Sequence, residues 1–190
     1  QLSIKGDTLN IDFEGTAEQV KSNMNSPFAS SVSSAIACVK SVLTDPDIPF
    51  NEGAERAINV KIPYGSILNP RPRAPVRARL LPSYRVVNAV MKALGEAVPE
   101  RIIAPGFDTT SVCCLSHKLA DGYNIYLEIF GGGFGAGPNY DGCDAVDSML
   151  SNCSNIPIES MESDYPFFRV EDYSLRSSSG GNGKFRGGMG

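Results

Sequence analysis

Proline and glycine restrict the fold of this chain more than any other residues, because they occur in concentrated blocks. Residues 63–82 contain five prolines and four arginines, and residues 131–137 contain five glycines. Proline fixes φ and removes a backbone donor, so the first block cannot be an interior strand or a long helix. Glycine blocks are typical of turns and close backbone contacts. We therefore expect long, fitted loops between short helices and strands.

The hydrophobic periodicity between these blocks predicts an α+β fold, with a mostly antiparallel β-sheet and two main helices in a single region over residues 1–190. Ser26 and Pro27 give a helix start, with apolar residues at helical spacing until Pro46. Ser83 gives a second start, and Gly95 a plausible stop. The other expected elements are a β-hairpin over 2–13, a strand over 56–62, a hairpin of strands 111–118 and 123–130, a short helix over 143–150 and a strand over 167–176.

Charge and length exclude several classes of function. The net charge is −4 and the isoelectric point is near 5.0, which disfavours nucleic-acid and anionic-membrane binding. No run approaches the roughly 20 apolar residues of a membrane-spanning helix. The start of the chain has no signal-peptide pattern, so we expect a cytoplasmic protein, and both ends look like cuts in a longer chain. The four arginines of 63–82 have no interleaved aromatic residues, which favours a solvated or inter-subunit loop over a single-strand nucleic-acid site.

Cysteine and histidine give little support to a metal or redox site. The five cysteines have no C-x-x-C spacing, so we expect reduced, mostly buried thiols. Cys113 and Cys114 are adjacent in an expected strand and should point to opposite faces. His117 is the only histidine, so a two-histidine metal site is excluded and a structural role is favoured.

The two glycine-rich segments each allow two interpretations. Residues 131–137 fit a loose G-x-G-x-x-A, but Pro138 and Asn139 follow where a dinucleotide site needs a helix, and the chain contains no G-K-[ST]. A fitted structural turn is therefore favoured over nucleotide binding. Residues 179–188 combine bare amides with Lys184 and Arg186, which could wrap an anion, although a surface loop or subunit contact is favoured.

Four charged residues beside these glycine segments are our candidates for catalysis. If the two segments lie close together, Asp141, Glu159 and Glu162 could point into the space between them, with Arg186 as their counter-charge. The alternative is that the glycines only permit close packing of the backbone. The sequence leaves both open.

Several motifs, in this order, resemble the hydantoinase B/5-oxoprolinase family over essentially all 190 residues. They are Asp12-Phe13-Glu14-Gly15-Thr16, Asn51-Glu52-Gly53, residues 62–70, Ala74-Pro75-Val76, residues 131–136, Asp141-Gly142, residues 155–159, Glu162, Tyr165-Pro166, and the glycine-rich run from 179 to 190.

The resemblance implies an internal piece of the B-type subunit of an ATP-dependent cyclic-amide hydrolase of the N-methylhydantoinase or 5-oxoprolinase type. The implied partner is an actin-like A-type subunit in a hetero-oligomer, which uses ATP with Mg to activate the amide, and the small cyclic amide is the substrate. No nucleic-acid or membrane partner is implied. We expect no cofactor in these residues and no activity from them alone.

Three points stay open under this resemblance. A further divalent metal could serve the whole complex, but in metal-dependent relatives its ligands lie in a more N-terminal part of the B-type chain, so no ligand is carried over. One alternative is a subunit of an ATP-dependent acetone- or acetophenone-type carboxylase. The other is a non-catalytic scaffold and subunit-interface module.

Overall fold

A computed structural model describes all residues, 1–190, and the chain divides into two compact units. Unit 1 comprises residues 1–104 and unit 2 comprises residues 105–190. The single region predicted from the sequence, residues 1–190, covers both units. Helices and short, antiparallel-rich sheets together make the α+β fold predicted from the sequence.

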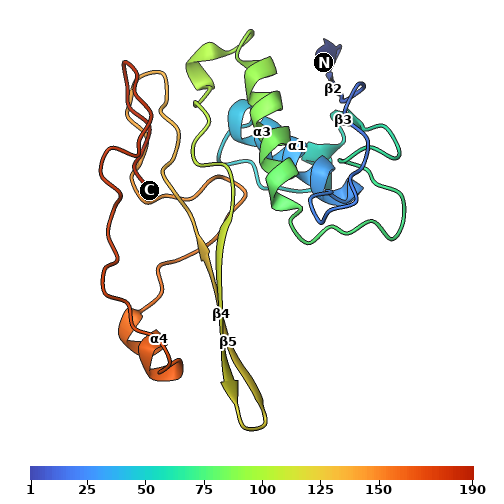
Figure 1. Ribbon diagram of the computed structural model, residues 1–190. Helices are drawn as coiled ribbons and strands as arrows, with labels where there is room; N and C mark the ends of the chain where they lie inside the picture. The colour runs from blue at the N-terminus through green and yellow to red at the C-terminus, as the bar shows by residue number, and fades with distance from the viewer. The chain divides into compact units, whose positions relative to one another are not determined.

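Unit 1 is a small three-stranded sheet covered by two helices (Figure 1). The sheet order is β1-β2-β3, in which β1 and β2 form the predicted antiparallel hairpin. The β2–β3 pair is parallel, since the chain returns to the sheet through a helical crossover. The elements are β1 (Leu2–Lys5), β2 (Thr8–Asp12), α1 (Phe28–Leu43), α2 (Glu52–Glu55), β3 (Ile58–Lys61), α3 (Leu80–Leu94) and η1 (Pro99–Arg101).

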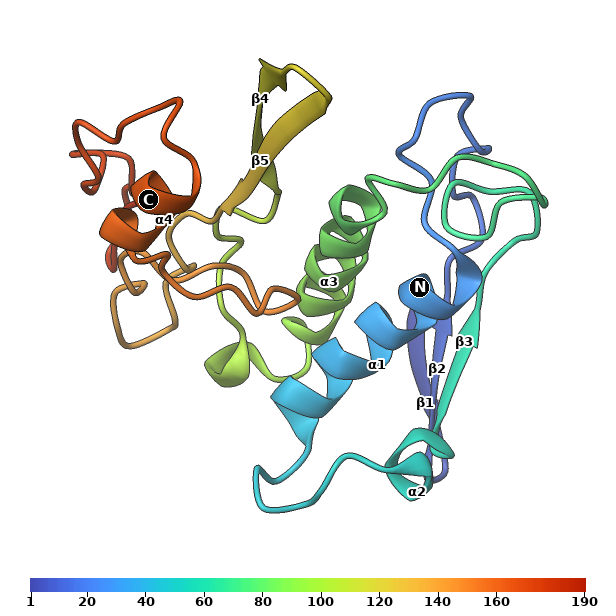
Figure 2. The ribbon, with the colours of Figure 1, turned by 90° about the horizontal axis from the view of Figure 1, so that it is seen from below.

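The core of unit 1 lies where α1 and α3 pack against each other and against the sheet, as Figure 2 shows. Leu9 and Ile11 alternate along β2, so both side chains face the helices, and both are buried. Helical spacing brings Ala35, Val39 and Val42 of α1 to one buried stripe. The buried stripe of α3 consists of Pro82, Ser83, Tyr84, Val86, Val87, Val90, Met91 and Leu94.

Both predicted helix caps are wrong. α1 begins at Phe28, and Pro27 occupies the capping position rather than the first helical turn. The hydroxyls of Ser26 and Ser83 instead face each other at 3.3 Å in the buried contact between the two helices. α3 begins at Leu80, three residues before the expected cap, because Pro82 falls in the first turn, where its missing amide has no helical partner. The stop at Gly95 is confirmed.

A buried amide holds the loops of unit 1 together. The side chain of Asn25 is fully buried and makes four hydrogen bonds. Its Oδ1 accepts from the amide of Val20 at 2.8 Å, and its Nδ2 faces the carbonyls of Val20, Ser22 and Pro75 at 2.8 to 3.0 Å. Asn25 thereby ties the proline-rich segment, 50 residues away along the chain, to the entry of α1.

Unit 2 contains the predicted long hairpin, β4 (Ser111–Leu119) and β5 (Gly122–Phe130), and a short helix, α4 (Ile158–Asp164). Helix α4 was not predicted from the sequence. The helix predicted over 143–150 and the strand predicted over 167–176 are wrong, because both segments run as turns and irregular chain. Their backbone groups bond to distant loops instead: the amide of Ala145 donates to Met189, and that of Arg176 donates to Gly190.

The two faces of the hairpin differ. Residues paired across β4 and β5 share a face. On one face Tyr126 is buried under the rings of Tyr165 and Phe168 beside α4, and His117 stacks on Phe167 at 5.4 Å. The other face, hereafter the bare face, is largely apolar and exposed; its residues are Val112, Cys114, Ser116, Lys118, Tyr123, Ile125, Leu127 and Ile129.

The cysteines only partly follow the expectation. Cys113 and Cys114 do lie on opposite faces of the hairpin, and all five thiols are free. Only Cys38 is buried, so the prediction of mostly buried thiols is wrong. Burial raises the pKa of Cys38 to about 12, and its thiol donates to the carbonyl of Val87 at 3.6 Å.

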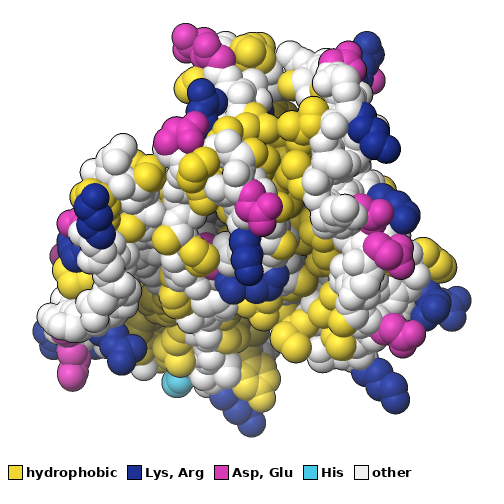
Figure 3. All heavy atoms as spheres, turned by 90° about the horizontal axis from the view of Figure 1, so that it is seen from above, with side chains coloured by type: hydrophobic (Ala, Val, Ile, Leu, Met, Phe, Trp, Pro, Cys, Tyr) yellow, Lys and Arg dark blue, Asp and Glu magenta, His cyan; other side chains and the backbone are white.

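Charges of both signs are mixed on the face that Figure 3 shows. Lys and Arg side chains lie scattered among Asp and Glu on the face shown in Figure 3, without a broad patch of one sign. None of the helices combines the length and the apolar character needed to cross a bilayer.

Candidate functional site

The two glycine-rich segments of unit 2 lie against each other, and we call this contact the glycine crossing (residues 131–137 and 186–190, with 141–143 beside them). The amide of Gly188 donates to the carbonyl of Phe134 at 2.9 Å, and the amide of Phe134 donates to Cys143 at 2.9 Å. A Cβ built on Gly133 would overlap the carbonyl of Gly188, and one on Gly188 would overlap that of Cys143. Glycine is required here because the backbones meet with no room for side chains.

The backbone amides on the C-terminal side of the crossing are all paired within the protein. All five amides from 186 to 190 donate to protein acceptors, which are the Asp141 carboxylate, the Gly181 carbonyl, the Phe134 carbonyl, the Asp144 carboxylate and the Ser179 hydroxyl. A phosphate or nucleotide loop needs several free amides aimed at the ligand. The amides of 186–190 are therefore not available to an anion, and within 131–137 the amides of Phe134 and Gly137 donate to Cys143 and Tyr140.

Two of the four predicted site residues, Asp141 and Arg186, contact each other directly, and Asp144, which is not among the four, joins them. The guanidinium of Arg186 binds both carboxylate oxygens of Asp144, at 2.7 and 3.0 Å. Asp141 accepts from the backbone amide of Arg186 at 2.8 Å, and its other oxygen lies 4.0 Å from the guanidinium. The hydrogen bonds and charge of Arg186, with the Met189 amide, lower the pKa of Asp144 to about 2. These contacts hold residues 141–144 against residues 186–189.

Glu159 and Glu162 lie on α4 and are not among the carboxylates that Arg186 contacts. Glu162 accepts from the amide of Val170 at 2.7 Å, which ties the chain after α4 back to the helix. Glu159 lies in the first turn of α4, where its charge is favourable. The expectation that these glutamates take Arg186 as their counter-charge is therefore wrong, because α4 uses them locally.

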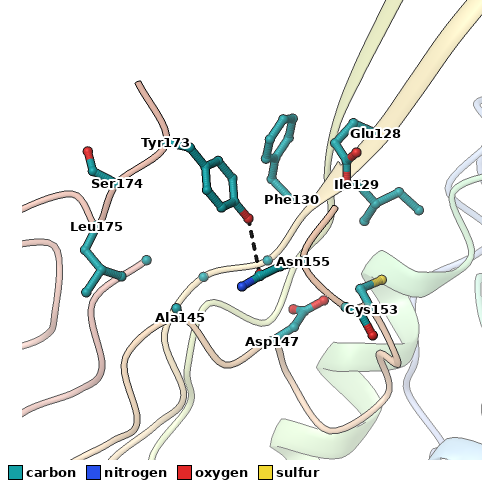
Figure 4. A pocket seen from close by; sticks show the side chains of 14 residues that line it. Glu128, Ile129, Phe130, Ala145, Asp147, Cys153, Asn155, Tyr173, Ser174 and Leu175 are labelled. Carbon is teal, nitrogen blue, oxygen red and sulfur yellow. Dashed lines mark hydrogen bonds between the residues drawn. The ribbon is translucent and has the colours of Figure 1, made fainter. Parts of the chain in front are cut away.

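A pocket of about 280 Å³, which we call the polar pocket, lies beside the crossing. Figure 4 shows its labelled side chains, with the Asn155 amide between the Tyr173 hydroxyl and the Asp147 carboxylate in that view. The hydroxyl of Tyr173 donates to Asn155 Oδ1 at 3.3 Å. Glu128 and Asp147 supply the charged groups of the wall. The full lining is Glu128, Ile129, Phe130, Gly131, Gly132, Ala145, Asp147, Cys153, Ser154, Asn155, Tyr173, Ser174, Leu175 and Gly190.

A second pocket of about 230 Å³, which we call the apolar pocket, lies between the covered face of the hairpin and α4. Its walls are mostly aliphatic and aromatic: Cys113, Leu115, Tyr126, Glu128, Phe130, Ile156, Ile158, Met161, Phe168, Val170, Asp172 and Tyr173. Glu128, Phe130 and Tyr173 line both pockets, so the two adjoin. Burial raises the pKa of Tyr126, and so does the hydrogen bond that it donates to Glu128 at 2.6 Å.

No group of three or more His, Cys, Asp or Glu side chains is arranged to hold a metal ion. His117, on β4, stacks its ring on that of Phe167, which agrees with the structural role favoured from the sequence. None of the four predicted catalytic residues lines either pocket.

Three residues of the site region were not selected from the sequence: Asp144, Asp147 and Asn155. Asp144 follows Asp141 by three residues in a segment taken for a helix, so its pairing with a residue 42 positions later had no local signal. Asp147 and Asn155 are isolated polar residues in irregular chain. Only the folded loops bring them to one pocket.

Comparison with known proteins gives one family. The family model described as Hydantoinase B/oxoprolinase matches residues 1–190. A protein of Pseudomonas sp. strain NS671, assigned as the B component of a D-/L-hydantoinase, is 36% identical over 195 residues, which cover 100% of this chain and 33% of that protein. The 5-oxoprolinase PfmaA of Pestalotiopsis fici is 36% identical over 94% of this chain and 14% of its own length.

Two solved structures share the fold. The ATP-dependent caprolactamase of Pseudomonas jessenii aligns with 99% of this chain and 33% of its own, at 27% identity and a TM-score of 0.81. A nucleotide-free acetone carboxylase aligns over 99% of this chain and 26% of its own, with a TM-score of 0.72. At 21% identity, the second likeness shows the fold alone. The chain thus spans about a third of the hydantoinase relative and of the caprolactamase chain.

Proposed function

Because this chain belongs to the Hydantoinase B/oxoprolinase family, we propose that it forms part of the B-type subunit of an ATP-dependent hydrolase of cyclic amides. The observation that carries the proposal is the likeness to the ATP-dependent caprolactamase, which extends over nearly the whole chain. A relative assigned to a hydantoinase and another named as a 5-oxoprolinase point to the same reaction class, ring opening at an amide. ATP would supply activation of the unreactive amide carbonyl.

ATP in this proposal is bound by an actin-like A-type partner rather than by these residues. The amides of residues 186–190 all donate to protein groups, and the chain has no G-K-[ST] motif. Calorimetry on the purified chain should detect no ATP binding at micromolar concentrations. Micromolar affinity for ATP would overturn this division of roles.

The proline-rich loop is our candidate contact with that partner. Arg73 and Arg77 are exposed, and neither forms an ion pair with this chain. Proline restricts the loop before docking, so little conformational entropy is lost when its arginines meet carboxylates. Arg73→Glu with Arg77→Glu should reduce co-purification with the A-type subunit, while Lys5→Glu with Arg169→Glu should not. Equal recovery of the partner by both double variants would contradict the contact.

The activity is tested by co-expressing the full B-type chain with the A-type subunit of the same system. With Mg and ATP, the complex should open 5-oxoproline, N-methylhydantoin or caprolactam and form ADP in step with ring opening. Bicarbonate should have no effect. Consumption of acetone or acetophenone that depends on bicarbonate would replace the hydrolase proposal with a carboxylase.

The catalytic role predicted for Asp141, Glu159, Glu162 and Arg186 is part of the proposal and needs its own test. Asp141 and Arg186 also brace the crossing, so lost activity means little unless the fold is kept. Each residue should be changed to Ala and the variant checked by circular dichroism before kcat is measured. A well-folded variant with unchanged kcat removes that residue from the catalytic set.

A further inference from the structure

We infer that the bare face of the β4–β5 hairpin is an internal packing surface of the full B-type chain, covered there by a segment that lies outside residues 1–190. The occupant is a further part of the same polypeptide, and neither a second copy nor the A-type subunit. This inference rests on the proposed function for the identity of the longer chain, and goes beyond it by assigning the surface on which that chain completes unit 2.

The apolar side chains of the bare face gather at the base of the hairpin, which is the end away from its turn. From that end, the cross-strand pairs are Val112–Ile129, Cys114–Leu127, Ser116–Ile125 and Lys118–Tyr123. The first two pairs carry no charge and no hydroxyl, whereas the single charge, on Lys118, lies near the turn. Cross-strand neighbours on one face form a continuous surface. The base therefore presents an apolar surface and the tip a more polar one.

Unit 2 leaves more apolar surface exposed than a complete fold would. It is the smaller unit, yet it holds twelve of the eighteen large hydrophobic side chains that are exposed, and seven of the twelve lie on the hairpin. Val112 is 54% exposed, Ile125 56% and Leu127 47%. Contiguous apolar patches on soluble proteins mark surfaces that another element covers. Strands that are apolar on both faces are typical of sheets buried on both sides.

The edges of the hairpin are open as well. The sheet has only two strands, so the outer edges of β4 and β5 have no strand beside them (Figure 1). Proteins cover long open edges with a helix, a loop or another strand, because uncovered edges pair with other molecules. A two-stranded ribbon is stable only when other elements pack on it. The rings beside α4 already occupy one face, so the bare face is where further cover fits.

The length of the relatives identifies the occupant. The chain spans 33% of the hydantoinase relative and 33% of the caprolactamase chain, so about two thirds of such a polypeptide lies outside these residues. A segment of the same polypeptide is held near the hairpin at a high effective concentration. It also packs without the loss of translational freedom that accompanies the binding of a separate molecule.

The residue types on the bare face also favour a contact within one chain over a contact between subunits. Contacts between subunits are enriched in aromatic residues, methionine and arginine. The base of the bare face has none of these and consists of Val112, Cys114, Leu127 and Ile129. Valine, cysteine, leucine and isoleucine are among the residues most often fully buried inside a protein. The arginines of the proline-rich loop, by contrast, have the character of a subunit contact.

The inference is tested by photo-crosslinking in the full B-type chain assembled with the A-type subunit. The photoreactive amino acid p-benzoylphenylalanine replaces Leu127 or, as the matched control, Ile48 of unit 1, since each of these side chains is 47% exposed. After irradiation, we expect the Leu127 variant to form an internal crosslink to a peptide outside residues 1–190, with the electrophoretic mobility of a single B-type chain. The Ile48 variant should not form that crosslink.

Four results at Leu127 would overturn the inference. These are a crosslink to a second B-type chain, a crosslink to the A-type subunit, a crosslink only within residues 1–190, and no crosslink at all. Peptide mapping by mass spectrometry distinguishes them. Formation of the same internal crosslink from Ile48 would overturn it too, because the contact would then not be specific to the bare face.

Cys114 provides a second measurement that requires no substitution. Its thiol lies on the bare face and is exposed in these residues. In the assembled complex, iodoacetamide should modify Cys114 at least about tenfold more slowly than in the same chain unfolded in urea, because the cover must open first. Tandem mass spectrometry distinguishes its product from that of Cys113. Equal rates in the two states would overturn the inference, even if the Leu127 variant does not fold.

These outcomes are distinct from those that test the proposed function. An internal crosslink from Leu127 in a complex that opens no cyclic amide would keep the packing surface and remove the hydrolase proposal. ATP-dependent ring opening by a complex in which Cys114 reacts as it does in urea would keep the hydrolase and remove the packing surface.

Discussion

Asn25 shows how one polar side chain can organise the loops of unit 1. It is fully buried, and its amide nitrogen faces three backbone carbonyls while its oxygen accepts one backbone amide. No residue other than Asn has this size and this set of donors and acceptors. Its position follows from the loops it joins rather than from any periodic pattern.

We expect Asn25→Asp to destabilise unit 1 strongly. The carboxylate would replace a donor by an acceptor against the carbonyls of Val20, Ser22 and Pro75, and a buried charge would have no partner. The loss in the free energy of unfolding should be about 3 kcal/mol or more. Urea titration gives the value, with Asn23→Asp, at an exposed side chain, as the control. A difference between the two variants below about 1 kcal/mol would contradict this role.

Asp144 makes the stability of the glycine crossing depend on pH in acid. Its pKa is about 2 in the folded chain and about 4 when unfolded, so between these values the unfolded chain binds more protons. The contribution of Asp144 is therefore fully present above about pH 4 and is lost as the pH falls toward about 2. Asp144→Asn should be less stable than the parent at about pH 6, and the gap should close by about pH 2. Urea midpoints with a constant gap over this range would exclude the effect.

At the scale of elements, the β4–β5 hairpin is unusual because its bare face has no cover in this chain. Val112, Ile125 and Leu127 are 47% to 56% exposed there. Exposed apolar strands are prone to pair with other molecules, and a two-stranded ribbon has no further strands to shield it.

We expect Ile125→Thr with Leu127→Thr to lower self-association of the chain and its binding of a hydrophobic dye such as ANS. Threonine keeps the preference for β-structure while removing apolar surface. Analytical ultracentrifugation and dye fluorescence measure the two effects. Ile4→Thr with Ile48→Thr, at exposed sites of unit 1, is the matched control. Equal changes in both double variants would mean that apolar exposure in general, and not the bare face, drives association.

Local signals decided which elements were predictable. Both hairpins and the end of α3 at Gly95 follow from alternation, turn residues and a glycine stop, all within a few positions. The helix and the strand predicted in unit 2 fail because residues 143–150 and 167–176 bond to the end of the chain, a partner that no local pattern reveals. α4 follows Pro157 and is only seven residues long, too short for a clear periodic signal.

The candidate site was predictable only in part, for the same reason. Concentrated glycine indicated close backbone approach, and the structure does bring Gly133 and Gly188 together. Asp141 and Arg186 are indeed neighbours, but Glu159 and Glu162 serve α4. The polar pocket depends on single residues from separate segments, so its chemistry exists only after folding.

At the scale of the whole molecule, the two units are stabilised differently. Among the buried hydrophobic side chains only Tyr126 and Met161 belong to unit 2, and all others belong to unit 1. Cooperative unfolding depends mainly on a shared apolar core. Unit 2 instead relies on backbone hydrogen bonds between its loops and on the aromatic contacts beside α4.

Expressed separately, residues 1–104 should therefore unfold in one cooperative transition, and residues 105–190 in a broad one. Circular dichroism during heating distinguishes the two, and the dispersion of amide signals in NMR provides an independent check. A sharp transition in 105–190 alone, with a broad one in 1–104, would contradict this division.

The glycine crossing also limits how the family can vary by mutation. At Gly133 and Gly188 the atoms that exclude a side chain are carbonyls of the opposing backbone, which every amino acid carries. A damaging Gly133→Ala change therefore has no neighbour that could shrink to compensate for it. In a genetic selection we expect no second-site substitution within the crossing to restore function, whereas a defect in the side-chain core, such as one at Val87, should yield suppressors among its neighbours. Only an insertion or deletion that changes the path of the backbone could restore function after such a substitution. We therefore expect the crossing to vary among relatives by changes in loop length.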